Sequence, residues 1–521
     1  MSLLLNPILQ FRGASLGQFM VSAIVVVPLG HKPRSLNPVA TPAKYVKITG
    51  PKPLAKIPLL NPSSEIYRID FQVIQGVSSE KIEYEIAGVK NEFYVPGIGE
   101  NFRIAYGSCF GFSDPSYMEK VDNNNERWQH LNSQHKAEPF NLFLMGGDQV
   151  YSDEMRYKVT AMRSWFSKSW TERADATWTE AMEHQVDAFY SWLYVNRWNQ
   201  TDILRVLGSI PTVMMWDDHD IIDGWGSYSE DLHNCEVFQG LFRLATSYFR
   251  LFQQQLAPGE VHPCAIPDSN GFHMGFKDLG KLALLVPDLR SERRPAITKP
   301  EPTFFPTQII GADSWRGIIN WLDGVTGHKH LILMSSIPVA YIDLHRAEQA
   351  LDFMPGRQEL EDDLRDHWRS EPHLQERRRL IRGLLDFSEN KRTKVTMVSG
   401  DVHVAGACIV ESKLPQHGPE GGANIMLQLI STGMVHPSPE SYKVWFLEQL
   451  GSSQEAIDLK ITGTMIPIGP RGRFLIPARN WLALEPDPPS DERYRLWAKW
   501  HVEGEKHPVE QMIDPVLLPR V

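Results

Sequence analysis

From residue 102 onward the chain alternates short apolar runs with longer segments of helical periodicity, and no other feature of the sequence restricts the fold as strongly. Short apolar runs bounded by Gly or polar residues are typical of buried strands, and helices between them return the chain to the same edge of a parallel sheet. The expected strands are residues 102–106, 140–145, 211–216, 281–286, 330–334, 395–398 and 425–430. The expected helices lie within residues 154–170, 186–193, 234–252 and 373–387. The pattern therefore predicts an α/β fold.

Residues 1–98 follow a different pattern, in which β-branched and aromatic residues form short alternating runs separated by Pro and Gly. Alternation with a period of two and frequent turn residues predicts antiparallel strands. We therefore expect a β-rich N-terminal domain at residues 1–98, an α/β domain at residues 99–435, and a C-terminal extension at residues 436–521 that packs on it.

The composition excludes several classes of protein. The 521 residues carry a formal net charge of −10, which is not typical of proteins that bind nucleic acid or anionic membranes through bulk electrostatics. The apolar segment 18–30 lacks the positive start and the cleavage site of a signal peptide, so we interpret it as a strand. No run reaches the ~18 apolar residues of a membrane helix. We expect a cytoplasmic protein without a membrane span, and the sequence identifies no partner protein.

Side chains that can bind metals follow four of the expected strands, at the point where each strand ends. These side chains are Cys109 after the first strand, Asp148 and Tyr151 after the second, Asp217, Asp218, His219 and Asp220 after the third, and Asp401 and His403 after the strand at 395–398. Each motif alone is common in turns and surface pairs. Because a parallel sheet would bring the four strand ends together, the combination predicts a metal site.

The third of these clusters, in the segment WDDHDIID, is crowded with negative charge. Asp217, Asp218, Asp220 and Asp223 place four carboxylates within seven residues around His219. Carboxylates this close repel one another unless cations or protons intervene. The segment therefore requires either a bound metal or extensive hydration.

The order and spelling of these motifs resemble the PhoD-like alkaline phosphatases and phosphodiesterases, a branch of the calcineurin-like metallophosphoesterases. The matching segments are residues 107–109, 147–151, 216–220, 288–290 and 399–403. The resemblance covers roughly residues 100–435 and implies a βαβαβ metallophosphoesterase sandwich with helical insertions, preceded by a small β-rich domain. It also implies a site for two or more metal ions.

The resemblance assigns ligand roles to several residues. Asp148 matches the carboxylate that bridges two metals, and Asp401 and His403 match the final metal-binding motif. Cys109 and Tyr151 match two positions that distinguish this branch from the rest of the superfamily. Thiolate and phenolate favour a trivalent or soft metal, which indicates Fe3+. Asp218 matches a ligand of the harder ion, Ca2+ by resemblance; Mn2+, Zn2+ and Mg2+ are the alternatives.

Two further residues match positions that act on the substrate. His219 matches the catalytic histidine, which can protonate the leaving oxygen or hold a phosphate oxygen. Arg290, in the segment VPDLRSERR, matches the active-site arginine, whose planar guanidinium can bind two phosphate oxygens. Arg293 and Arg294 follow closely, and we expect both to be exposed loop charges.

The other acidic residues of WDDHDIID leave alternatives open. Asp217 either orients His219 without touching a metal or shares the hard metal. Asp220 is a candidate for orienting His219. Asp223 is either a ligand or a turn residue. In the expected helix at 373–387, we expect the charged residues 377–379 to lie on a solvated face.

Taken together, the motifs predict a hydrolase that cleaves a small phosphate ester with metal-activated water. One alternative is a phosphodiesterase restricted to nucleotide, phospholipid or polymer diesters, which would use the same residues in a differently shaped pocket. A second alternative is a noncatalytic metal-binding protein. His219 and Arg290 argue against the second, because a purely structural metal site requires neither an acid nor a phosphate clamp.

Overall fold

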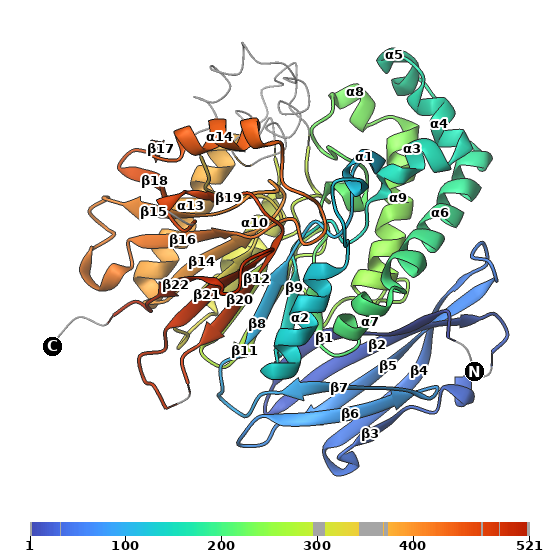
Figure 1. Cartoon of the computed structure of the whole chain (residues 1–521), viewed down its shortest axis with the longest axis horizontal. Helices are drawn as coiled ribbons and strands as arrows, with labels where there is room; N and C mark the ends of the chain where they lie inside the picture. The colour runs from blue at the N-terminus through green and yellow to red at the C-terminus, as the bar shows by residue number, and fades with distance from the viewer. Residues whose placement is uncertain are drawn as a thin grey trace.

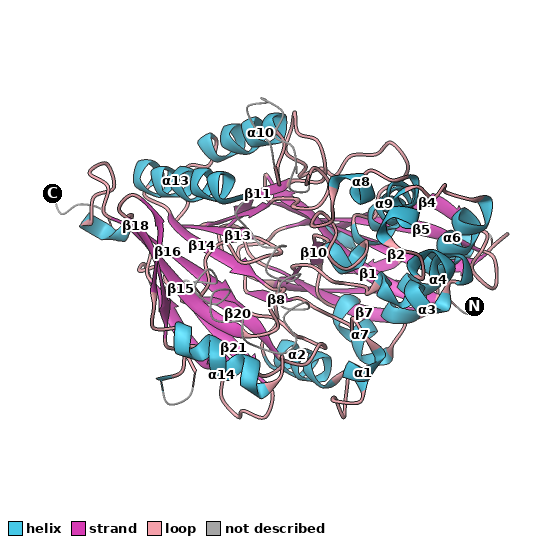
Figure 2. Cartoon of the chain, turned by 90° about the horizontal axis from the view of Figure 1, so that it is seen from above, coloured by secondary structure: helices cyan, strands magenta, loops and turns pink. Residues whose placement is uncertain are grey.

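The computed structural model of the chain describes residues 3–31, 33–294, 308–342, 368, 373–469, 472–488 and 490–517. It is a mixed α/β structure with two large sheets and one small one. Figure 2 shows the strands in the middle of the molecule, with helices α10 (Ala312–Asp323) and α13 (Leu374–Lys391) on one side and α2 (Glu126–Ala137) and α7 (Thr201–Leu207) on the other. The α/β prediction is confirmed.

The first sheet has ten strands in the order β22-β21-β20-β8-β9-β10-β1-β2-β5-β4. Its centre is parallel and consists of β8 (Ile104–Gly107), β9 (Leu142–Met145), β10 (Thr212–Met214) and β1 (Leu5–Ser15). One flank is antiparallel and consists of β2 (Gln18–Pro28), β5 (Ser64–Ile74) and β4 (Val46–Ile57). The other flank consists of β20 (Asn480–Pro486), β21 (Leu496–Val502) and β22 (Val509–Ile513). The first three expected strands therefore lie side by side.

The second sheet has nine strands. Its parallel part consists of β12 (Leu282–Val286), β13 (His330–Met334), β14 (Lys394–Ser399) and β16 (Ile425–Ile430). The antiparallel strands around it are β11 (Met274–Leu279), β15 (Ala405–Ser412), β17 (Gln454–Asp458), β18 (Ile461–Ile466) and β19 (Leu475–Ile476). The remaining four expected strands belong to this sheet.

The N-terminal residues are β-rich, as predicted, but they are joined to the rest of the fold. Gln10 in β1 pairs in parallel with Thr212 in β10, so the ten-stranded sheet runs across the boundary expected at residue 98. A separate sheet of three strands consists of β3 (Val39–Thr41), β6 (Glu80–Ile86) and β7 (Val89–Val95). The apolar segment 18–30 supplies β2, as predicted. The division into three domains stays a prediction.

Helices occupy all four ranges in which the sequence predicts them, and the described residues contain further helices outside those ranges, such as α2, α7 and α10. The helices whose bounds have not yet been given are α1 (Pro115–Met118), α3 (Met155–Lys158), α4 (Thr160–Phe166), α5 (Trp170–Ala174), α6 (Glu180–Trp198), α8 (Glu230–His233), α9 (Glu236–Tyr248) and α14 (Ser441–Leu450). Figure 1 shows α3 to α6 together with α8 and α9 at the upper right. In the described ranges, none of the helices combines the length and apolarity that crossing a bilayer requires.

One of the charges expected on a solvated face of α13 is buried. Arg377 in α13 is only 1% exposed, and its guanidinium donates to both carboxylate oxygens of Glu455 over 2.7 and 2.9 Å. It also donates to the carbonyl oxygen of Val339 over 2.6 Å. The prediction of a solvated face is therefore wrong for Arg377, because its partners come from segments far away in the sequence. Arg379 is half-exposed, in line with the prediction.

Candidate functional site

The carboxyl ends of β8, β9 and β10 lie level with one another at one edge of the ten-stranded sheet. Gly107 at the end of β8 pairs with Met145 at the end of β9, which in turn pairs with Met214 at the end of β10. Each apolar strand stops there, and the loops that follow carry Cys109, Asp148 and the Asp217–Asp220 segment. The register of the strands thus brings the three loops together, as the sequence predicts.

The fourth strand end belongs to the other sheet, so the prediction that one parallel sheet gathers all four ends is wrong. Ser399 at the end of β14 pairs with Ile430 of β16. The loop after β16 reaches the loop after β8, where Ser108 Oγ donates to the carbonyl oxygen of Ser431 over 3.3 Å. The site forms where the carboxyl edges of two sheets meet. A strand's own sequence does not reveal which sheet it joins.

Four of the predicted ligands have a backbone conformation that L-residues seldom adopt. The φ angles are +57° at Cys109, +57° at Asp148, +71° at Asp401 and +53° at His403. A left-handed residue without a glycine's freedom is under strain that the surrounding structure must offset. Its occurrence two to four residues after the ends of three different strands, β8, β9 and β14, indicates that these loops are shaped to aim side chains at a common point.

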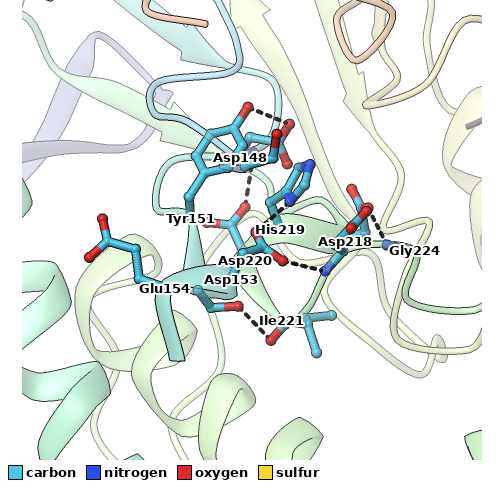
Figure 3. A network of polar contacts seen from close by, with 12 residues as sticks. Asp148, Tyr151, Asp153, Glu154, Asp218, His219, Asp220, Ile221 and Gly224 are labelled. Atoms are coloured by element: carbon cyan, nitrogen blue, oxygen red, sulfur yellow. Dashed lines mark hydrogen bonds and ion pairs between the residues drawn. The ribbon is translucent and has the colours of Figure 1, made fainter. Parts of the chain in front are cut away.

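Two overlapping groups of side chains are arranged to bind cations. Ligand atoms of Asp148, Asp218 and His219 all lie within 4.8 Å of one another, and so do those of Asp217, Asp218 and Asp401. Asp218 belongs to both groups, which fits more than one ion. Figure 3 shows Asp148, Asp218 and His219 facing a common space.

The electrostatics of these carboxylates favour bound cations. Burial, followed by the charges of Asp218 and Asp217, raises the pKa of Asp148 well above its usual range. Burial also raises the pKa of Asp217 to about 8, against the opposing effect of Arg290. Asp148 Oδ1 is buried and has no hydrogen-bond partner among the described residues. A cation would neutralise this charge and satisfy that oxygen, so the residues present fit metal ions.

Tyr151 and Cys109 lie beside Asp148. The Tyr151 hydroxyl donates to Asp148 Oδ2 over 3.5 Å (Figure 3), and the ring stacks on His219 with centroids 4.4 Å apart. Gly111 packs so closely on this ring that a Cβ atom there would overlap it. Cys109 Sγ lies 3.1 Å from Thr432 Oγ1. Burial raises the pKa of both the thiol and the phenol, so each is protonated unless a cation stabilises its anion.

The partner of His219 is Asp153, a residue that the sequence analysis missed. His219 Nδ1 lies 2.6 Å from Asp153 Oδ2 (Figure 3), and Asp153 is only 1% exposed. Burial alone would lower the pKa of His219, but Asp153 and then Asp218 raise it well above its usual range. The available signal was a second carboxylate in the segment GDQVYSD, five residues after Asp148.

Asp220 does not orient His219, contrary to the sequence-based hypothesis. Its carboxylate instead accepts hydrogen bonds from the backbone N–H groups of Asp148, Val150 and Asp217 and from the Gln253 side chain. The 3-10 helix at Asp218–Asp220 turns the side chain back toward the strand ends and away from the histidine. Asp220 therefore ties the loops of the site together.

The structure bears on the alternatives left open for Asp217 and Asp223. Asp217 Oδ1 accepts from Ser336 Oγ over 2.8 Å and forms an ion pair with Arg290. Asp223 pairs with Arg156 over 3.0 Å, and neither cation-binding group includes it. Of the two alternatives for Asp223, the geometry favours the turn residue. Of the two for Asp217, it favours a place next to Asp218 in one of the two groups that could bind a cation.

Arg290 lies at the centre of the site and is fully buried. Its guanidinium pairs with Asp217 and Asp218, at 3.4 Å in the second case, and donates to the carbonyl oxygen of Trp225 over 2.9 Å. Arg293 is 2% exposed and packs against Gly226, so the prediction of an exposed charge is wrong for this residue. Arg294 is exposed, as predicted.

The sequence analysis also missed His436, a histidine that lies next to His403. The rings of His403 and His436 stack with centroids 3.8 Å apart, and His436 also lies 6.2 Å from the ring of Tyr151. Burial lowers the pKa of His403 to about 4, which leaves a neutral imidazole able to bind metal. The signal for His436 was its place shortly after the expected strand at 425–430. Like the four strand ends singled out in the sequence, the end of this strand is followed by a side chain that can bind metal.

Comparisons with known proteins bear on the fold and on the family of the chain. A solved structure described as "Structure of PhoD" superposes with a TM-score of 0.57 at 13% identity, covering 97% of this chain and 88% of that one, which shows a similar fold. A dimetal phosphatase from Danio rerio covers 80% of this chain and 100% of its own at 10% identity, with a TM-score of 0.38 that is too low to bear on the fold.

Sequence comparison gives a relative and a family. The uncharacterized protein YGR266W of Saccharomyces cerevisiae is 27% identical over 409 residues, which cover 67% of this chain and 57% of the yeast protein. The chain thus spans less than two thirds of that relative's length. Residues 81–358 and 353–457 match the family described as PhoD related phosphatase. Since these ranges make up most of the chain, the resemblance of the motifs is confirmed, and the protein belongs to the PhoD-related phosphatases.

Proposed function

We propose that this protein hydrolyses phosphoric esters with the help of two or more metal ions. The observation that carries the proposal is the pair of cation-binding groups that share Asp218, flanked by a histidine–carboxylate pair and a buried arginine. Asp148, Asp217, Asp218 and Asp401 would supply carboxylate ligands. Cys109, Tyr151 and His403 would supply thiolate, phenolate and imidazole. Cations held there would supply Lewis acidity and a hydroxide nucleophile near neutral pH.

His219 would act as the general acid. Asp153 raises the pKa of the ring and accepts a hydrogen bond from Nδ1, which favours a proton on both ring nitrogens. Nε2 then carries the second proton and can donate it to the departing alkoxide oxygen. Asp153 stabilises the imidazolium before transfer and fixes the orientation of the ring. The pair therefore provides a proton at a defined position without requiring a covalent intermediate.

Arg290 would stabilise the negative charge that builds up on the phosphate oxygens. A buried guanidinium acts in a low-dielectric environment, where its charge is screened less than in water. Its ion pairs with Asp217 and Asp218 hold the group in place before substrate arrives. Substrate binding would require the guanidinium to share its donors between these carboxylates and the phosphate.

The test of the proposed function is metal analysis of the protein purified without added metal, together with turnover of an aryl phosphate monoester and of the matching diester. We expect bound metal, turnover of at least one ester, and loss of turnover after chelation. Preference for the diester alone would favour the phosphodiesterase alternative. Bound metal without turnover of either ester would favour the noncatalytic alternative.

Arg290→Lys is expected to lower turnover by about 10² while bound metal stays near the wild-type amount. Lysine keeps the positive charge but loses the planar pair of donors that fits a phosphate. Metal content and steady-state kinetics measure the two effects separately. The exposed Arg294→Lys is the matched control and should behave as wild type. Unchanged kinetics in Arg290→Lys would remove this arginine from the mechanism.

The ions at Cys109 and Tyr151 are expected to give the protein a visible colour if Fe3+ occupies that position. A free phenol has a pKa of about 10 and a thiol about 8.5, so only a strongly charged cation holds both as anions near neutral pH. Tyr151→Phe and Cys109→Ser should each shift or bleach the absorption band. Cys235→Ser, at another buried cysteine, should leave it unchanged. A colourless protein that stays active with Mg2+, Mn2+ or Zn2+ would argue against iron.

A further inference from the structure

Three consecutive glutamines, Gln253 to Gln255, are almost completely buried at the end of the π-helix Phe249–Gln253 that follows α9. Burying an amide side chain is unfavourable unless its hydrogen bonds are satisfied. Each of the three donates to a different part of the fold. Gln253 Nε2 donates to Asp220 Oδ1 over 3.0 Å, Gln254 Nε2 to the carbonyl oxygen of Met214 over 3.0 Å, and Gln255 Nε2 to that of Ile8 over 2.8 Å. Only the first of these contacts reaches the candidate site.

The carboxylate that Gln253 contacts joins two of the loops that carry metal ligands. Asp220 Oδ2 accepts from the backbone N–H of Asp148 over 3.0 Å and from that of Asp217 over 2.9 Å. Asp220 Oδ1 accepts from the backbone N–H of Val150 over 3.1 Å. Asp148 and Val150 follow β9, whereas Asp217 follows β10. One side chain therefore sets the distance between the two loops.

Gln253 is itself held from both sides. Gln149 Nε2 donates to Gln253 Oε1 over 3.2 Å and also to the carbonyl oxygen of Met215 over 2.9 Å. Gln253 Nε2 also donates to the Tyr194 hydroxyl over 2.9 Å. These contacts connect the ends of β9 and β10 to α6 and to the π-helix. Such a network leaves the Asp220 carboxylate little room to rotate.

We propose that Asp220 and Gln253 form a positioning pair that fixes the spacing of the metal-binding loops before the ions arrive. This inference rests on the proposed function. A carboxylate with four hydrogen-bond donors has its charge satisfied by the protein, so Asp220 serves as a spacer and Gln253 holds it in place. Metal ligands bind well only when they are held within about 0.5 Å of the required geometry. Without Gln253, Asp220 would lose one donor, and the two loops would move more freely relative to each other.

The test compares Gln253→Met with Gln254→Met. Both glutamines are about equally buried and adjacent, and both substitutions replace a straight amide side chain by an apolar one of similar length. We expect both variants to lose thermal stability, and Gln253→Met to lose more, because the Gln253 side chain contacts Asp220, Tyr194 and Gln149 whereas that of Gln254 contacts the carbonyl oxygen of Met214. Only Gln253→Met should bind Mn2+ more weakly, by roughly 10- to 100-fold in equilibrium dialysis, as is typical when a residue that supports a metal ligand is lost. Excess Mn2+ should restore much of its turnover.

A second pair of variants keeps the test decisive if Gln253→Met does not fold. Asp220→Asn preserves volume but turns an acceptor into a donor facing backbone N–H groups, so it should also weaken Mn2+ binding. In the double variant Gln253→Met/Asp220→Asn, the loss should be clearly smaller than the product of the two single losses, because the residues act as a unit. Additive losses would overturn the inference.

Dialysis also separates this inference from the proposed function. A wild-type protein that binds no Mn2+ would contradict the proposed metal site itself. A wild-type protein that binds Mn2+, with Gln253→Met and Gln254→Met affected equally or not at all, would overturn the positioning role alone.

Discussion

Asp148→Asn is expected to abolish nearly all turnover and most metal binding while leaving the fold intact. Asp148 is fully enclosed, one of its oxygens has no partner among the described residues, and the resemblance assigns it the bridging position between the ions. An amide cannot supply the negative charge that such a position requires. The loss should exceed the ~100-fold effect of removing a residue that only supports a ligand. Metal content and turnover of an aryl phosphate measure it.

The backbone conformation at Asp148 is compatible with asparagine, so the substitution should change the side chain's charge without straining the loop. Asparagine tolerates the left-handed conformation that Asp148 adopts at φ +57° about as well as aspartate does. Asp268→Asn is the matched control, because Asp268 has the same φ of +57° but is exposed and lies outside both cation-binding groups. Full activity with normal metal content in Asp148→Asn would refute the site assignment.

His219→Ala is expected to slow hydrolysis by about 10² to 10⁴, the usual contribution of a positioned general acid. Metal content should stay close to that of the wild type, because the acid acts on the substrate. Asp153→Asn should produce a smaller loss of the same kind, since it leaves the imidazole in place but removes the carboxylate that orients it. In the double variant, Asp153→Asn should add little to the loss caused by His219→Ala.

The same variants decide between two roles of His219. Its ring lies within ligand distance of Asp148 and Asp218, so a metal ligand would be the other role. Loss of bound metal in His219→Ala would establish that role and move the acid to another group. His233→Ala, at a buried histidine whose ring packs at a tilt against Trp225 with centroids 4.7 Å apart, controls for loss of packing.

The strands and the ends of the strands could be predicted from the sequence. The expected strand at residues 330–334 coincides with β13, and that at 425–430 coincides with β16. Such runs are buried on both faces, so burial requires apolar residues along their whole length, and a Gly or Asp marks where the strand stops. The convergence of Cys109, Asp148 and Asp217 followed from the common direction of parallel strands.

The partners of charged residues could not be predicted, because they depend on contacts between distant segments. Asp153 and Asp220 are both acidic and both close in sequence to site residues, yet only Asp153 contacts His219. Their roles depend on how two loops 66 residues apart fold against each other. The sequence around Arg377 has the charge pattern of a solvated helix face. Its burial is stabilised by the carboxylate of Glu455 in β17, which no local pattern reveals.

The α/β class, the ends of the strands and the chemistry of the candidate ligands that follow them could be predicted from the sequence alone, because each is encoded in a short contiguous segment. The origin of the candidate ligands in two sheets, the contact of Asp153 with His219 and the contact of Gln253 with Asp220 depend on tertiary packing. Hydrogen bonds and ion pairs form between groups that are close in space, whatever their separation in the sequence. Burial strengthens them and penalises any buried polar group left without a partner. Local patterns specify which groups are available, and packing decides which of them meet.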